Sequence, residues 1–172
     1  MIPTKFNKFI LVTLLCLPFS CLTTYCLHSA KVMKDGSELL YGSTNAQQLF
    51  FDFPDWKSEY DEYQPDPKII GELNFDNLLA VEIFFGTWCE DSQREVPHFL
   101  KIIDRSHLCS ADNIYLYAVD RNKQLNTDLC NVRNIDRVAT FIFYRSGNEI
   151  GRIVESPLQT LEQDMYTIIN KR

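Results

Sequence analysis

The sequence predicts an α/β domain in which a mixed β-sheet is flanked by helices. Two apolar runs, residues 79–85 and 114–119, have the length and composition of buried central strands. Each run is followed by a segment with apolar residues at helical spacing, and the chain closes with a hairpin pattern and a last helix. With 172 residues, 45% of them hydrophobic, the chain is long enough for one domain with a proper core.

The region before the first central strand contains weaker signals. Residues 34–36, Lys-Asp-Gly, are typical of a turn, and Thr44 followed by Gln47 fits the capping box of a short helix. Residues 49–53 form an apolar run that we interpret as a strand, ended by Pro54.

Two helices are expected next. The aromatic residues Trp56, Tyr60 and Tyr63 lie at the spacing of one helix face, which favours packing against the core. Asp66 followed by Pro67 is a typical helix start, with a capping side chain and a proline in the first turn. We therefore assign residues 31–77 to an N-terminal extension that packs on the core.

After the first central strand, a helix is predicted over 93–104 and another over the polar segment 122–133, whose apolar residues fall at helical spacing. Residues 138–144 and 149–154 form a hairpin around Ser-Gly-Asn. A last helix begins at Pro157, and its predicted buried face consists of Leu158, Leu161, Met165 and Ile168.

Cys89 is the clearest candidate for chemistry. It lies between the apolar strand 79–85 and the start of the following helix. At that place the helix dipole and unpaired backbone N–H groups stabilise a thiolate, which is the nucleophilic form of cysteine. Glu90 and Asp91 oppose the thiolate by like-charge repulsion, and Arg94 is positioned to offset them.

The segment Trp88-Cys89-Glu90-Asp91-Ser92 resembles the Trp-Cys-x-x-Cys site of the thioredoxin-like superfamily. Pro97, eight residues after Cys89, matches the proline of the family's active-site helix, and the strand 114–119 and the hairpin follow in the family's order. The resemblance covers roughly residues 78–170, and we assign residues 78–172 to a thioredoxin-like domain. It implies that Trp88, Ala139 and Thr140 border a groove for a substrate peptide.

Three positions depart from the family pattern. Ser92 replaces the second cysteine, which resolves the mixed disulfide in a dithiol cycle. Ala139 replaces a cis-proline, and because a cis bond before a non-proline residue costs about 3 kcal/mol, we expect a trans bond there. Ile83 replaces a buried acid. For Ser92 two interpretations are open, a hydrogen-bond donor to the sulfur of Cys89 or an ordinary residue of the first helical turn.

The N-terminus predicts export. Lys5 and Lys8 precede an apolar run, residues 9–19, and no charged residue occurs from Phe9 to Ala30. Three alternatives for residues 1–30 are open: a cleaved signal peptide, a membrane anchor, and a lipoprotein signal with Cys21 as the lipidated residue. All three place the body outside the cytoplasm, in the periplasm or another extracytoplasmic space.

Of the six cysteines, Cys89, Cys109 and Cys130 lie in the body. An odd number leaves at least one thiol unpaired, and Cys89 is the natural one. Two buried thiols at Cys109 and Cys130 are favoured over a disulfide between them. His98 is too far along the helix from Cys89 to share a metal ion with it, so no metal site and no cofactor is expected.

The sequence thus favours a monothiol thiol–disulfide exchange protein with Cys89 as nucleophile and Ser92 beside it. Its expected partners are exported proteins that contain cysteines, or small thiols. The net charge of −6 argues against nucleic acid. Two alternatives are a binding or chaperone module without redox turnover and a single-cysteine peroxidase, which would need Arg94 at the thiol.

Overall fold

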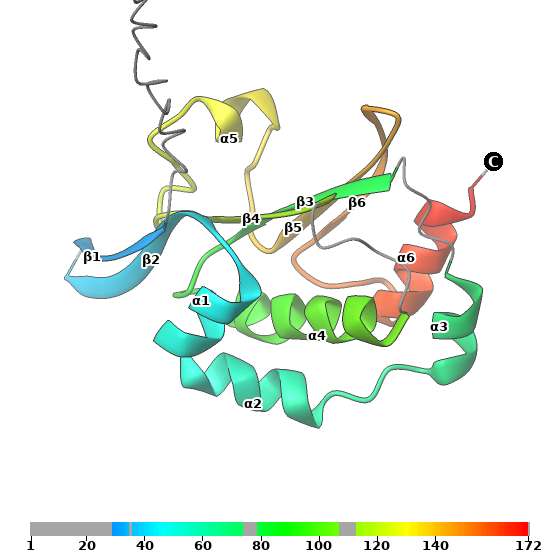
Figure 1. The fold of residues 1–172 in the computed structure, drawn as a ribbon. Coiled ribbons are helices and arrows are strands. Elements are labelled where there is room, and N and C mark those ends of the chain that lie inside the picture. Colours follow the sequence, from blue (N-terminus) through cyan, green and yellow to red (C-terminus); the bar gives the residue numbers. More distant parts are fainter. Residues whose placement is uncertain (1–28, 35, 74–78, 107–112, 172) are drawn as a thin grey trace, which may run out of the picture.

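A six-stranded mixed sheet forms the centre of the protein (Figure 1). The computed structural model describes residues 29–34, 36–73, 79–106 and 113–171. The elements along the chain are β1 Ala30–Lys34, β2 Ser37–Thr44, α1 Ala46–Asp52, α2 Pro54–Glu62, α3 Pro67–Glu72, β3 Leu79–Phe85, α4 Glu90–Ser106, β4 Ile114–Ala118, α5 Leu129–Val132, β5 Thr140–Arg145, β6 Asn148–Val154 and α6 Leu161–Ile169.

The strand order is β1-β2-β4-β3-β5-β6. β3 lies between β4, to which it is parallel, and β5, to which it is antiparallel. The parallel pair is connected through α4, as a parallel connection requires, and β5 and β6 form the predicted hairpin. These pairings confirm the predicted class, a mixed α/β sheet with helices on its faces.

The helices cover the two faces of the sheet unequally. α4 and α6 lie on one face with α1, α2 and α3, whereas α5 lies on the other (Figure 1). The larger buried cluster lies under α4 and includes Phe85, Phe99 and Phe141. The smaller cluster lies on the α5 face around Phe84 and Val138, and Cys89 packs against its edge.

The predicted strand at 49–53 is wrong, because this segment belongs to the helix α1. The side chain of Asn45 caps the helix by accepting a hydrogen bond from the Gln48 N–H at 2.8 Å. Leu49 is fully buried and Phe50 packs beside it on the larger cluster. The apolar residues 46, 49, 50 and 53 have helical spacing, which the short run at 49–53 concealed.

The sequence predicted a turn at residues 34–36 but not the edge strands β1 and β2 on either side of it. Gly36 has φ of 76°, a conformation that favours glycine. β2 then pairs with β4, so part of the region assigned to an extension completes the sheet.

The predicted helix over 122–133 is reduced to the four residues of α5. Asp120 is the reason, because its carboxylate accepts hydrogen bonds from the Asn122 and Gln124 N–H groups at 3.0 and 2.9 Å. Those bonds form a turn instead of a first helical turn.

The last helix begins later than expected. Thr160, not the residue before Pro157, caps α6, and the Leu158 side chain is 96% exposed. Leu161 and Met165 are buried as predicted and Ile168 is half-buried, so the helix spacing was correct and its start was wrong.

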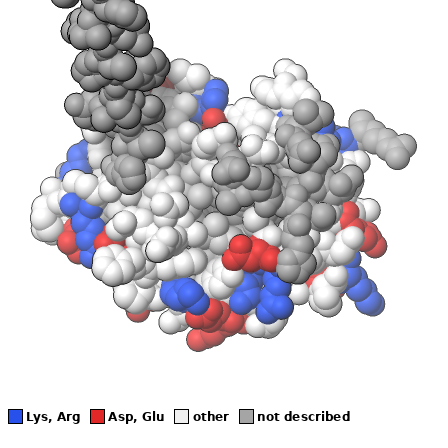
Figure 2. Space-filling model, in the orientation of Figure 1, with Lys and Arg blue, Asp and Glu red and all other residues white. Residues whose placement is uncertain are grey.

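Charges of both signs are interspersed over the described surface that Figure 2 shows, instead of forming a continuous basic area. Several acidic and basic groups are directly paired, as Lys31 with Glu38 and Arg152 with Glu149 are. Within residues 29–171, apart from the gaps given above, no helix is both long and apolar enough to cross a bilayer.

Removing a core aromatic ring should cost far more stability than removing an exposed one. Phe99 is fully buried between Phe141 and Phe143, whereas Phe51 is 80% exposed. We expect Phe99→Ala to lower the free energy of unfolding by about 3–5 kcal/mol and Phe51→Ala by less than about 0.5 kcal/mol. Denaturant unfolding of both variants measures this, and equal losses would show that α4 does not pack on the sheet as described.

Candidate functional site

Cys89 caps the N-terminus of α4, directly after the central strand. Its N–H donates to the Gly86 carbonyl at 3.0 Å, which closes the turn that follows β3. Its own carbonyl accepts from the Gln93 N–H at 3.0 Å, the first hydrogen bond of the 17-residue helix. The N–H groups of the first turn lack helical acceptors, so the positive end of the helix dipole lies at this residue.

The thiol of Cys89 is half-buried and faces the loop before β5. Its Sγ–H donates to the Val138 carbonyl oxygen at 3.1 Å. Val138 is buried in the smaller cluster, so this contact fixes the sulfur at the boundary between core and solvent. The residue as a whole is only partly exposed, and the Val138 carbonyl covers one side of its sulfur.

Ser92 lies one turn into α4, but it is not bonded to the sulfur. Its side chain is fully buried, and its Oγ accepts a hydrogen bond from the Gly86 N–H at 3.2 Å. The serine therefore ties the end of the β3 turn to the helix. A role for Ser92 in stabilising a thiolate stays a hypothesis.

The peptide bond between Val138 and Ala139 is cis, so the expectation of a trans bond is wrong. That expectation counted only the local preference of a non-proline residue. Tertiary contacts hold both sides of this bond: the Val138 carbonyl accepts from the Cys89 thiol, and the Ala139 carbonyl accepts from the Glu155 N–H at 2.7 Å. Neither contact is visible in the sequence around residue 139.

Two of the three predicted groove residues are buried. Ala139 is fully enclosed, and the Thr140 hydroxyl donates to the Arg137 carbonyl at 2.7 Å. Their side chains therefore support the loop that faces Cys89, and the carbonyl of Val138 is the group that meets the sulfur.

Trp88 is half-buried beside Cys89 and held on three sides. Its indole N–H donates to the Val119 carbonyl at 3.2 Å, and the guanidinium of Arg121 lies 5.5 Å from the ring centre. A Cβ at Gly86 would lie 2.5 Å from the indole, so only glycine allows the ring to fold back over this turn. Arg121 was missed because no sequence signal links it to Trp88.

The loop that carries Arg121 is anchored by Asp120. Burial by itself would raise the pKa of this carboxyl, but the hydrogen bonds from Lys34 and from two backbone N–H groups outweigh it and hold the pKa below its usual range. The same hydrogen bonds of Asp120 shorten the helix predicted over 122–133. They also fix the turn that places Arg121 against the ring of Trp88.

Several charged side chains of β3 and of the first turns of α4 are paired with neighbouring groups. Ile83 is fully buried at the position of the family's acid. The neighbouring Glu82 is bound by Arg133 at 2.6 Å and by Tyr144 at 2.9 Å. Arg94 is bound to Asp91 and Glu95, both at 2.8 Å, and to nearby Ser156 at 2.9 Å, so its guanidinium is engaged away from Cys89.

The remaining cysteine and histidine predictions can be located in part. Cys130 is an unpaired, buried thiol on α5, and burial raises its pKa to about 11. Cys109, His107 and the N-terminal cysteines lie outside the described residues. His98 stacks on Tyr63, with ring centres 3.8 Å apart. Among the described residues, no cluster of three His, Cys, Asp or Glu side chains has the geometry of a metal site.

Comparison with solved structures finds proteins with a similar arrangement. Oxidised mitochondrial thioredoxin 3 from Saccharomyces cerevisiae is 22% identical, with 51% of this chain and 73% of that chain covered and a TM-score of 0.34. Thioredoxin O2 from Arabidopsis thaliana is 19% identical, with coverages of 59% and 84% and a TM-score of 0.41. A Pseudomonas aeruginosa protein of unknown function is 14% identical, with coverages of 73% and 85% and a TM-score of 0.48.

No family profile and no curated protein matches this chain. The strand order and the position of α4 directly after the central strand β3 give the chain a thioredoxin-like fold.

Alkylation should distinguish Cys89 from Cys130. Cys89 is half-exposed, whereas Cys130 is buried and, with a pKa of about 11, carries roughly one thiolate per thousand molecules at pH 8. In the folded protein at pH 8 we expect iodoacetamide to modify Cys89 at least about tenfold faster. Peptide mass spectrometry over time measures both rates, with urea-unfolded protein as the control in which the rates converge. Equal rates in the folded protein would contradict the site.

Proposed function

We propose that this protein is a monothiol thiol–disulfide exchange protein with Cys89 as its nucleophile. The thiolate of Cys89 attacks one sulfur of a partner disulfide, a new S–S bond forms, and the other partner sulfur leaves as a thiolate. An external thiol then attacks the partner sulfur of the mixed disulfide, which releases Cys89 as a thiolate and leaves the partner joined to that thiol. A second external thiol attacks this new bond, which releases the reduced partner and forms a disulfide between the two external thiols. The two external thiols together supply the two electrons that the pair of cysteines supplies in a dithiol protein.

The observation that carries this proposal is the contrast between Cys89 and Ser92. The sulfur lies half-exposed at the helix start, whereas the residue at the resolving position is a fully buried serine whose oxygen accepts the Gly86 N–H. A hydroxyl does not resolve a mixed disulfide, so an adduct on Cys89 persists until another molecule attacks it.

The contacts of Arg94 weigh against peroxide chemistry at Cys89. A single-cysteine peroxidase needs a cation or a base that activates its thiol, and Arg94 was the candidate. Its three hydrogen-bonded partners, Asp91, Glu95 and Ser156, hold the guanidinium elsewhere. The sulfur instead has a backbone carbonyl, Val138, as its hydrogen-bond partner.

A binding module without redox turnover is the second candidate. It is favoured by the buried Ser92 and by the apolar Ile83 at the position of the family's acid, since both lack the proton and sulfur chemistry of a dithiol enzyme. In that role, Trp88 and Arg121 would contact the partner and Cys89 would be replaceable.

The proposed partners are exported proteins that contain cysteines, or small thiols, and the proposed location is outside the cytoplasm. The support is the sequence of residues 1–30, two lysines followed by an apolar run without acids. Oxidising compartments are where protein disulfides form and persist, so substrates for Cys89 would be present there.

Restoring the second cysteine should convert the protein to a dithiol reductase. We expect Ser92→Cys to raise the turnover of a peptide disulfide with dithiothreitol by about tenfold or more, because an internal thiol resolves faster than an external one. The matched control is Ser106→Cys, another buried serine of the same helix, far from Cys89. Wild-type turnover already equal to that of Ser92→Cys would contradict the monothiol mechanism.

Cys89→Ser separates the two candidate functions. An exchange protein loses covalent capture of a disulfide-containing partner in this variant, and a binding module keeps its non-covalent affinity within about twofold. Trp88→Ala is the companion variant and should weaken a binding module while leaving the thiol in place. Both readouts come from one pull-down, run with and without a reductant on exported proteins of the host.

A further inference from the structure

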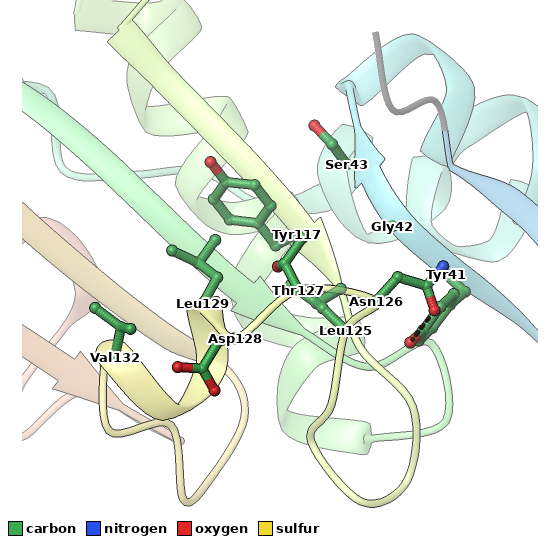
Figure 3. Close-up of a pocket in the computed structure, with 10 residues that line it drawn as sticks. All are labelled: Tyr41, Gly42, Ser43, Tyr117, Leu125, Asn126, Thr127, Asp128, Leu129 and Val132. Carbon is green, nitrogen blue, oxygen red and sulfur yellow. Dashed lines mark hydrogen bonds between the residues drawn. The ribbon is translucent and has the colours of Figure 1, made fainter. Parts of the chain in front are cut away.

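The protein has a cavity that is separate from the candidate thiol site. It is a cavity of about 500 Å³ between β2, β4 and the segment 125–132, and its lining does not include Cys89. Figure 3 shows its walls, which are formed by Tyr41, Gly42, Ser43, Tyr117, Leu125, Asn126, Thr127, Asp128, Leu129 and Val132. The volume is in the range of cavities that hold a small ligand or several side chains.

The inner wall of the cavity is apolar and its rim is polar. Tyr117 stacks on the buried Phe84, and Leu125 and Leu129 pack against the same small cluster. Val132 is 59% exposed although it lines the cavity. An open apolar surface of this kind is typical of a site that binds another segment or molecule.

The rim is fixed in part by a hydrogen bond. The Tyr41 hydroxyl donates to Asn126 Oδ1 at 3.1 Å, which joins β2 to the segment that forms the opposite wall (Figure 3). The cavity is therefore a built feature in which two distant parts of the chain are held together.

The chain enters the described structure at the rim of this cavity. The N–H of Ser29, the first described residue, donates to the carbonyl of Ser43, a lining residue, at 2.6 Å. The residues immediately before it, 20–28, read Ser-Cys-Leu-Thr-Thr-Tyr-Cys-Leu-His and carry no acid, lysine or arginine. Nine residues reach at most about 30 Å when extended, which is long enough to enter a cavity of about 500 Å³ from its rim.

The charge around the cavity favours residues 20–28 over an anionic membrane surface as its occupant. Asp128 lies on the rim and the chain has a net charge of −6, so an anionic lipid headgroup would be repelled. Residues 20–28 meet no such repulsion, and their Leu and Tyr side chains match the apolar walls.

We propose that residues 20–28 of this chain dock into the cavity between β2, β4 and α5. The docked segment covers Val132 and the rings of Tyr41 and Tyr117. It holds the body close against the apolar run 9–19 that precedes it, whether or not Cys89 performs exchange chemistry. The cavity thus serves as the attachment point between the N-terminal region and the folded body.

Photo-crosslinking in the full chain tests the docking. Benzoylphenylalanine at Thr127, an exposed lining residue, should crosslink to residues 20–28 of the same molecule in dilute protein held in lipid nanodiscs. The same probe at Phe51, exposed on α1, is the control and should not reach that segment. Crosslinks from Thr127 to lipid or to a second copy, or no crosslink at all, would overturn the proposal.

A charge placed in the cavity supplies the second arm. Val132→Asp should reduce the intramolecular crosslink from Thr127 by about fivefold or more, because the carboxylate makes the apolar wall unfavourable for the segment. Val154→Asp, an exposed valine on β6, is the matched control and should leave the crosslink unchanged. Both substitutions replace exposed valines, so both variants should fold. A crosslink that survives Val132→Asp would place the segment elsewhere.

Discussion

The pairing of β3 on both sides is the constraint on which the rest of this structure depends. β4 runs parallel to it and β5 antiparallel, so the end of β3 lies in the middle of the sheet. The turn that follows starts α4 and places Cys89 at the helix N-terminus. β5 begins beside the same end of β3, which brings the Val138 carbonyl to the sulfur. The Cys89 thiol and the carbonyl that it contacts thus come from residues 49 positions apart in the sequence.

The sequence predicted secondary structure correctly where a segment's pattern fits only one kind of element. It did not do so where the pattern fits both a strand and a helix, or where a distant side chain decides. The run that became β3 is apolar except for Glu82, which is typical of a buried central strand, and Cys89 was identified from its place after that run. The segment 46–53 fits two periods, and only burial of Leu49 and the Asn45 cap decide for a helix. The segment 122–133 has Leu125, Leu129 and Val132 at helical spacing, but the Asp120 carboxylate accepts hydrogen bonds from N–H groups at its start that a helix would need.

In the candidate site, too, the sequence identified some residues but not the contacts that they make. Cys89 and Trp88 were identifiable because a strand, a turn and a helix follow one another in sequence. Three contacts depend on the tertiary structure: the thiol with Val138, the Ser92 hydroxyl with Gly86, and Arg121 with the ring of Trp88. The cis bond before Ala139 belongs with them, because its neighbours on both sides are bound by distant residues. Local sequence preference counts none of these contacts.

The candidate thiol site and the proposed docking cavity lie on the same small apolar cluster. Cys89 packs on the edge of the cluster around Phe84, and Leu125 and Leu129 of the cavity pack on the same cluster. The α5 face therefore supports the thiol on one flank and the proposed docking of residues 20–28 on the other. The α4 face, with its larger core, supplies the stability of the domain.

The central claim, that Cys89 exchanges with disulfides and that no group of this chain resolves the product, has a direct measurement. The reduced full chain is mixed with oxidised glutathione, quenched with acid at successive times, and analysed by intact mass and peptide mapping. The account predicts that Cys89 acquires one glutathione and keeps it until reduced glutathione is added. Loss of that adduct to an internal disulfide between Cys89 and another cysteine of the chain, or no adduct on Cys89, would contradict it.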